Sequence, residues 1–181
     1  MILSLFISGK KSGHRRWLEE VYDRFHGDLL RYTRSVLGEE QKAREVVQET
    51  FLKLWKAETP PDHSHLQQWL LAVCRNGALD VLRKEKKLVF HDKEATVPDP
   101  APDAAGMMEK GQEQSLALRL LAALPADQRE VIRLKFQHGC SYKQISAVTG
   151  HSESNVGYLI HTGIKTMRSK AGKNSLKKKE A

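Results

Sequence analysis

The side chains best suited to hydrogen bonding with nucleic-acid bases lie in the stretch SYKQISAVTGHSESNVGYLIHTGIKTMR, residues 141–168. Its second half carries Glu153, Asn155 and Tyr158 at helical spacing. In the DNA major groove, glutamate accepts from cytosine, asparagine pairs with adenine and an apolar side chain contacts the thymine methyl. We expect the exposed positions of this segment to be Glu153, Ser154, Asn155, Gly157, Tyr158, His161 and Thr162.

None of these positions is a lysine or arginine, although phosphate attraction needs cations. The chain supplies them nearby, because residues 114–181 hold 12 basic and 4 acidic side chains, net +8. Lys143 precedes the segment and Lys165 follows its polar face. We therefore expect phosphate contacts from these flanks, and from the free N–H groups at the start of the helix.

Two short helices must position this face. Ser141 is a suitable N-cap for a helix over 142–148, Gly150 suits a left-handed turn, and Ser152 can cap the next helix. The residues expected to pack the two helices together are Ile145, Val148, Val156, Leu159 or Ile160, and Met167. This pattern predicts a helix-turn-helix, and an ordinary helical hairpin also fits the spacing.

Helices are also predicted before this motif. A helix over 112–123 ends at Leu124-Pro125, and Asp127 is a candidate cap for the next helix. The residues predicted inside that next helix are Val131, Ile132, Leu134 and Phe136.

The N-terminal region has the same helical character. The apolar stripe predicted for its first helix is Trp17, Val21, Phe25, Leu29, Tyr32 and Val36, with Gly38 at the C-cap. A second helix over 41–55 should bury Ala43, Val47, Phe51 and Leu54. A third, over 66–87, should be deeply packed at 69–74 and then open a polar side with Asn76, Asp80, Arg83, Lys84 and Lys87.

Composition fits a globular nucleic-acid binder. The 181 residues are 40% apolar and 29% charged, with net charge +8 and pI near 9.5. Cys74 and Cys140 are predicted to be reduced, buried thiols of a cytoplasmic protein. No apolar run is long enough to span a membrane, and the start MILSLFISGKK lacks the features of a signal peptide. His63 and His65 lack a third ligand nearby, so we expect no metal and no cofactor.

No segment shows strand alternation, which predicts an all-α fold of two small helical domains. The expected division is a domain over 14–87, a flexible acidic and proline-rich linker over 88–112, a helix-turn-helix domain over 113–171 and a basic tail over 172–181.

Three motifs carry a resemblance to a known family: AREVVQETFLKLWK (43–56), LQQWLLAVCRNGALDVLRKEKK (66–87) and LPADQREVIRLKFQHGCSYKQISAVTG (124–150). Together they resemble the sigma-70 family of RNA polymerase sigma factors, in particular its small extracytoplasmic-function (ECF) type. The resemblance implies a non-enzymatic protein that binds core RNA polymerase and promoter DNA and directs transcription initiation. Members are often held inactive by an anti-sigma factor, which nothing in the sequence identifies.

The resemblance also implies roles for individual residues. Polymerase docking would involve Val47, Gln48, Glu49, Phe51, Leu52 and Trp55. Recognition and melting of the −10 promoter element would involve His63, Ser64, Trp69, Asn76, Asp80, Arg83 and Lys84, with Trp69 either in the core or stacked on a base. The −35 element would be contacted by Lys143, Glu153, Ser154, Asn155, Gly157, Tyr158, His161, Thr162 and Lys165.

Two other functions are possible for a helical chain of this kind, a DNA-binding regulator that works without polymerase and an enzyme. A helix-turn-helix regulator that works without polymerase explains the C-terminal unit and leaves the motifs at 43–56 and 66–87 without a role. An enzyme needs clustered carboxylates or a metal constellation, and the sequence shows no paired acids with a neighbouring histidine.

Overall fold

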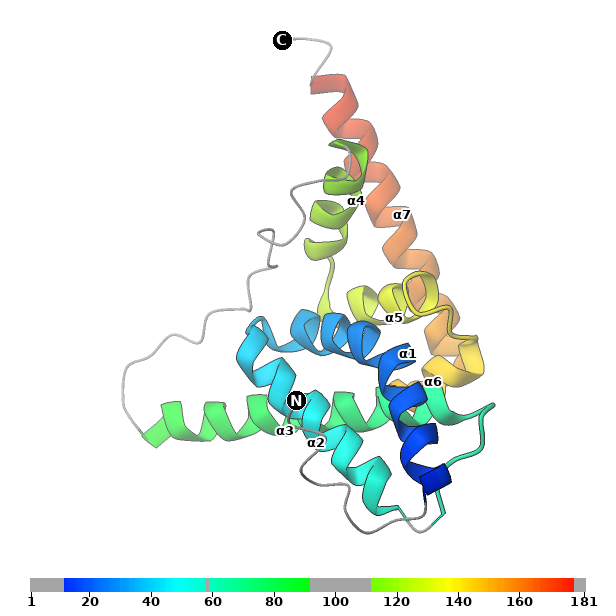
Figure 1. Cartoon of the computed structure of the whole chain (residues 1–181). Coiled ribbons are helices and arrows are strands. Elements are labelled where there is room, and N and C mark those ends of the chain that lie inside the picture. The colour runs from blue at the N-terminus through cyan, green and yellow to red at the C-terminus, as the bar shows by residue number, and fades with distance from the viewer. Residues whose placement is uncertain (1–11, 58, 92–111, 178–181) are drawn as a thin grey trace. The chain divides into compact units, whose positions relative to one another are not determined.

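The computed structural model describes residues 12–57, 59–91 and 112–177, and within them the regular secondary structure is helical (Figure 1). This confirms the all-α prediction. The chain divides into two compact units, the first ending at Leu82 and the second beginning at Arg83, and each is described by itself. The helices are α1 (Ser12–Leu37), α2 (Glu40–Lys56), α3 (Leu66–His91), α4 (Gln112–Ala122), α5 (Ala126–Phe136), α6 (Tyr142–Thr149) and α7 (Glu153–Lys177).

Helix α1 buries a stripe that only partly matches the prediction. The predicted members that are buried are Val21, Leu29 and Tyr32. The predicted members that are only half-buried are Trp17, Phe25 and Val36, while Leu18, Thr33 and Leu37 are buried as well. The helix ends where expected, because Gly38 adopts φ 74° and its N–H donates to the Arg34 carbonyl at 2.8 Å.

The three helices of the N-terminal unit share one core. Leu37 of α1, Ala43 and Val46 of α2 and Ala78 of α3 form a buried cluster. Gly77 explains how closely α2 and α3 approach, because a Cβ at this position would lie 3.0 Å from Val46 Cγ1. The predicted buried face of α2 is confirmed at all four positions, and the start of α3 is deeply packed at Leu66, Leu70, Leu71 and Cys74.

Helix α3 is longer than the sequence predicts. It was expected to end at Lys87 and continues to His91, so the first residues of the predicted linker are helical. The central part of that linker, residues 92–111, lies outside the described residues. At the other end of the chain α7 runs to Lys177, so the described part of the predicted tail is helical as well.

The C-terminal unit corrects two predictions. Pro125, not Asp127, stands at the N-cap of α5, and Asp127 lies in the first turn without a side-chain capping bond. Phe136 was predicted inside and is 64% exposed, while Val131, Ile132 and Leu134 are buried. Phe136 is the last residue of α5, where the helix ends, and the described residues leave most of its side chain exposed.

Two cations close the C-terminal end of α4. Arg129 Nη1 donates to the Ala122 carbonyl at 3.2 Å, and Lys170 Nζ of α7 donates to the Ala123 carbonyl at 3.3 Å. The last carbonyls of a helix lack partners within the helix and carry partial negative charge. These bonds therefore tie both α5 and the C-terminal half of α7 to α4.

Candidate nucleic-acid interface

The turn between α6 and α7 is built by local hydrogen bonds. Ser141 and Gln144 form a reciprocal capping box at the start of α6, with N-to-side-chain oxygen distances of 3.2 and 2.8 Å. Gly150 ends α6 with φ 80°, and the Asn155 N–H donates to Ser152 Oγ at 3.2 Å to begin α7. These bonds confirm the predicted caps and turn, and they fix the N-terminal end of α7 relative to α6 within the motif.

The inner side of this motif is core. Ile145, Val156 and Ile160 are each at most 4% exposed. Helix α7 continues through Gly157 and Gly163 without interruption. A Cβ at Gly163 would lie 2.6 Å from Ile132 Cδ1 and 3.4 Å from Gln128 Cβ, so this glycine lets α7 approach α5 closely.

The outer side of α7 carries the predicted base-reading residues. The exposed ones are Glu153, Ser154, Asn155, Tyr158 and His161. Gly157 and Thr162 are half-buried, and Thr162 Oγ1 donates to the Tyr158 carbonyl within the helix. The predicted flanking cations Lys143 and Lys165 are both exposed. The described surface thus combines a polar helix face with cations beside it.

Helix α3 presents a second polar surface, which begins in the first unit and continues along the helix past Leu82. Asn76, Asp80, Arg83 and Lys84 are all exposed, on the side of the helix away from the buried Cys74 and Ala78. Trp69 lies seven residues before Asn76 on the same side and is half-buried, so it is neither a core residue nor a free platform. A row of cations beside amide and aromatic groups is the composition that single-stranded nucleic acid requires.

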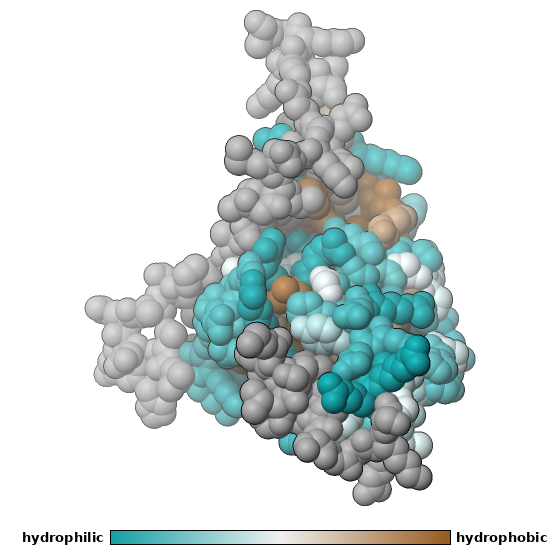
Figure 2. Space-filling view, in the orientation of Figure 1, coloured by the Kyte–Doolittle hydropathy of each residue, from teal (hydrophilic) through white to brown (hydrophobic). Residues whose placement is uncertain are grey.

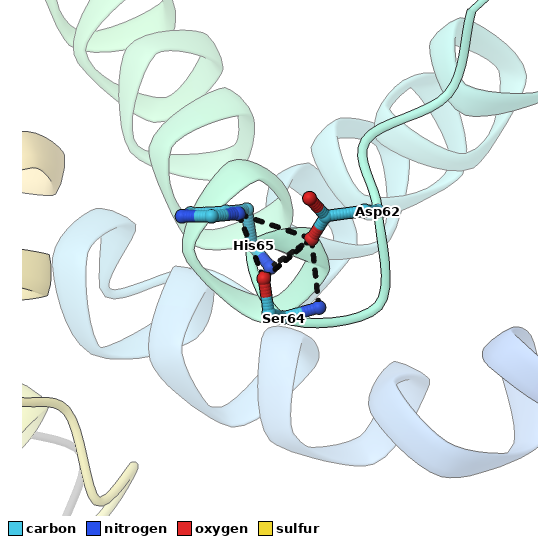
Figure 3. Close-up of polar contacts among 3 residues, drawn as sticks. All are labelled: Asp62, Ser64 and His65. Atoms are coloured by element: carbon cyan, nitrogen blue, oxygen red, sulfur yellow. Dashed lines mark hydrogen bonds and ion pairs between the residues drawn. The ribbon is translucent and has the colours of Figure 1, made fainter.

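The loop before α3 is fixed by one carboxylate (Figure 3). Asp62 Oδ1 accepts from the Ser64 N–H at 2.9 Å, the Ser64 hydroxyl at 2.5 Å and the His65 N–H at 3.1 Å, and it lies 3.0 Å from His65 Nδ1. These hydrogen bonds, the one from the Ser64 hydroxyl foremost, lower the pKa of Asp62 to about 2. We call these three residues the Asp62 clamp.

The Asp62 clamp is not a catalytic triad, although it contains an aspartate, a serine and a histidine. Ser64 Oγ lies 2.9 Å from His65 Nδ1, the same ring nitrogen that faces Asp62, and the serine hydroxyl donates to the carboxylate. A triad needs the nucleophile and the acid on opposite ring nitrogens. Among the described residues there is also no group of three side chains that could hold a metal ion.

Helix α2 carries the residues predicted to dock on a protein partner, and they fall into two sets. Gln48 and Glu49 are exposed, and Leu52 and Trp55 are half-buried, so these four reach the surface. Val47 and Phe51 are 1% and 2% exposed, and they belong to the core instead. The prediction that these two residues contact polymerase directly is therefore wrong, because a buried side chain can only support the surface from beneath.

The described surface is largely hydrophilic, and the two cysteines lie beneath it. Figure 2 shows hydrophilic residues over most of the coloured surface facing the viewer. No described helix is long and apolar enough to cross a membrane. Both cysteines are free and buried, and burial raises the pKa of Cys140 to about 11.

A helix-turn-helix with an exposed polar second helix defines a DNA-binding protein, and a second helical unit with its own polar row accompanies it. Comparison with known proteins gives the family. Residues 21–88 match the model of Sigma-70 region 2, and residues 115–167 match that of Sigma-70, region 4.

Individual relatives agree. The ECF RNA polymerase sigma factor RpoE of Cereibacter sphaeroides is 31% identical over 70% of this chain and 71% of its own length. The ECF RNA polymerase sigma factor SigM of Bacillus subtilis is 29% identical over 76% and 85%. The sigma factor RpoE of Bartonella quintana, solved in complex with the anti-sigma factor NepR, has the same fold, with a TM-score of 0.66, 22% identity, and coverage of 83% of this chain and 94% of that one.

The chain therefore belongs to the sigma-70 family, in its ECF group. It is an RNA polymerase sigma factor, whose partners are core RNA polymerase and promoter DNA and whose role is promoter-directed transcription initiation. The comparisons do not favour the helix-turn-helix regulator that works without polymerase.

Two features of the site were missed by the sequence analysis. The Asp62 clamp was one, although the order D-x-S before a helix is a recognisable turn signal. The contact of Tyr142 with α7, described below, was the other, and no local pattern announces it.

Proposed function

We propose that the two units read the two promoter elements separately. The exposed row of α3, together with the loop that the Asp62 clamp holds, would bind the melted −10 strand. The exposed face of α7 would enter the major groove of the −35 element. The observation that supports this proposal is the separation of polar from buried sides on both helices, since Asn76 of α3 and Asn155 of α7 are both exposed on the side opposite the core.

The −10 role rests on the chemistry of the α3 row. Asn76 offers both a donor and an acceptor to a base edge, and Arg83 and Lys84 offer charge to the strand backbone. Trp69 is half-buried, so one part of the indole is held by the core and the other is open to a stacked base. His63 is exposed beside the clamp and would contact a base that has left the stack.

Polymerase docking is proposed for the surface of α2 that Gln48, Glu49, Leu52 and Trp55 form. Two half-buried apolar side chains beside exposed polar ones resemble the centre and rim of a protein interface. The protein itself would catalyse nothing, and it would act in the cytoplasm, where polymerase and chromosomal DNA meet. We also propose control by an anti-sigma factor, as crystallised with the Bartonella quintana relative.

The test is transcription in vitro by core polymerase and the full-length protein, on promoter libraries with the two elements randomised separately. Asn76→Ala should alter base preference in the −10 library and leave the −35 preference unchanged. Asn155→Ala should do the reverse, so each variant is the control for the other. If either variant changes the wrong library, or if core polymerase gains no promoter preference from the wild type, the proposal is wrong.

A further inference from the structure

The outer face of α7 has one position without a side chain, Gly157, and a side chain from another helix lies beside it. Gly157 lies between the exposed Asn155 and Tyr158. A Cβ built on Gly157 would meet Tyr142 Cε2 at 3.5 Å and Cδ2 at 4.0 Å, and nothing else within 4 Å. The ring of Tyr142, the first residue of α6, therefore lies against α7 at this point.

Tyr142 is not there as a core residue. It is 41% exposed, while the residues that join α6 to α7, such as Ile145 and Val156, are fully buried. A ring that packs on one side and remains open on the other adds surface to the face it packs on. The sequence predicted Gly157 only as an exposed −35 contact, and the structure places a tyrosine ring beside it.

A cation from a third helix accompanies the ring. Lys135 Nζ of α5 lies 5.4 Å from the centroid of the Tyr142 ring. The same ammonium lies 3.4 Å from the Cys140 carbonyl oxygen, to which it donates. A cation over an aromatic face at this distance is attracted to it. The Tyr142 ring therefore lies between the Lys135 ammonium and the side of α7 at Gly157.

We propose that Tyr142 is a DNA contact of the −35 reader and determines part of its sequence preference. The inference rests on the proposed role of α7. Tyr142 lies beside Gly157, the neighbour of the exposed Tyr158, and is itself 41% exposed. Lys135 brings to this point the positive charge that the first turns of α7 lack. The ring contacts a thymine methyl group in the major groove, which is a base contact and therefore affects sequence preference, whereas a phosphate contact would not.

The experiment compares four variants of the full-length protein with core polymerase on the randomised −35 library and on one fixed promoter. Tyr142→Ala should lower affinity for the fixed promoter about fivefold or more, the lower end of what one base contact provides. It should also change the preferred base at one or two −35 positions. Tyr142→Phe separates the hydroxyl from the ring, and Arg31→Gln, at an exposed cation of α1, is the control that should behave as wild type.

Gly157→Lys is the independent arm, and it tests the proposal even if Tyr142→Ala fails to fold. Its long side chain competes with the ring for the same space and adds a cation. The −35 preference should change at the same positions as in Tyr142→Ala, and the slope of log affinity against log salt should steepen by about 0.9.

The proposal is overturned if Tyr142→Ala is folded and keeps the wild-type −35 preference, or if Gly157→Lys leaves that preference unchanged. A merely structural Tyr142 would lower the unfolding midpoint and leave base preference alone. If the wild type itself shows no −35 preference, the proposed role of α7 fails, which is a different result from failure of the Tyr142 contact.

Discussion

The two helices proposed to bind DNA, α3 and α7, differ in where their cations lie. On α3 the cations Arg83 and Lys84 stand in the same exposed row as Asn76. On α7 the exposed residues of the first three turns include Glu153 and no lysine or arginine, and cations lie around it at Lys135, Lys143 and Lys165. On α3 the cations and the proposed base contacts therefore share one face, whereas on α7 the cations lie beside the face that would contact bases.

The difference matches the two forms of DNA. A melted strand has no partner to hold its backbone, so the protein must supply cations along the same path as the base contacts. In a duplex the phosphates lie on both sides of the groove, so cations beside the reading helix reach them. Changes to each helix should therefore have different effects, and the largest effect is expected from a change that displaces α7.

Gly163→Leu should displace α7 and leave α3 intact. The added side chain has no room, since even a Cβ would lie 2.6 Å from Ile132 Cδ1. Overpacking of this kind costs up to about 3 kcal/mol of unfolding free energy. Denaturant unfolding measures that loss, and transcription should lose its dependence on −35 and keep its −10 preference. Gly157→Ala is the matched control, expected to raise stability by up to about 1 kcal/mol.

Neutralising Arg83 and Lys84 together to glutamine tests the charged row of α3. Open-complex formation should slow by about tenfold, and its salt dependence should fall by about 1.4, because two phosphate contacts to a single strand are lost. Initial binding should change much less. The control is Arg16→Gln with Arg31→Gln, two exposed cations of α1. Equal losses in initial binding and opening would contradict a role in melting.

Removing the Asp62 clamp should have a smaller effect, confined to −10 recognition. Asp62→Ala frees Ser64 and His65, and we expect a several-fold loss of −10 discrimination in the randomised library with −35 preference unchanged. Asp62→Asn keeps an oxygen acceptor for the two N–H groups and should retain most of the preference. An unchanged −10 preference in Asp62→Ala would mean that the loop takes no part in reading.

The clamp also predicts a pH dependence. Its hydrogen bonds lower the pKa of Asp62 from an ordinary 3.8 to about 2, so the folded state favours the ionised carboxylate. The stability it contributes is complete above about pH 4 and is lost as the pH falls toward 2. In acid unfolding, Asp62→Asn should therefore lose less stability than wild type across this window. Identical acid profiles would show that the clamp adds nothing to stability.

The smallest effect is expected from Glu153→Gln on α7. Removing a carboxylate from the exposed face should raise affinity for duplex DNA about twofold at low salt, since repulsion from phosphates is relieved. Preference at the one position that Glu153 contacts should weaken, as read in the −35 library. A loss of affinity instead would mean that α7 relies on this acid for its placement.

Local sequence patterns predicted much of this fold because their causes are local. Ser141 with Gln144, Gly150 and Ser152 each act within a few residues, through a capping bond or a left-handed turn. Phe136 was misplaced because periodicity cannot tell where a neighbouring helix stops covering an element. The approach of Tyr142 to Gly157 could not be predicted for a related reason, since the two residues are fifteen positions apart and lie on different helices.

The sequence by itself determined the helices, their caps, the helix-turn-helix and the family, all of which follow from short-range spacing and recognisable motifs. Only the tertiary structure decided which of the predicted site residues reach the surface and which groups lie beside them. It left Gln48, Glu49, Leu52 and Trp55 as the part of the predicted docking set that reaches the surface of α2. It also showed that Gly163 makes room for α5, and it brought Lys135 and Tyr142 close to Gly157 of α7. The physical reason is that contacts between helices depend on interaxial distance and rotation, which many distant side chains set together.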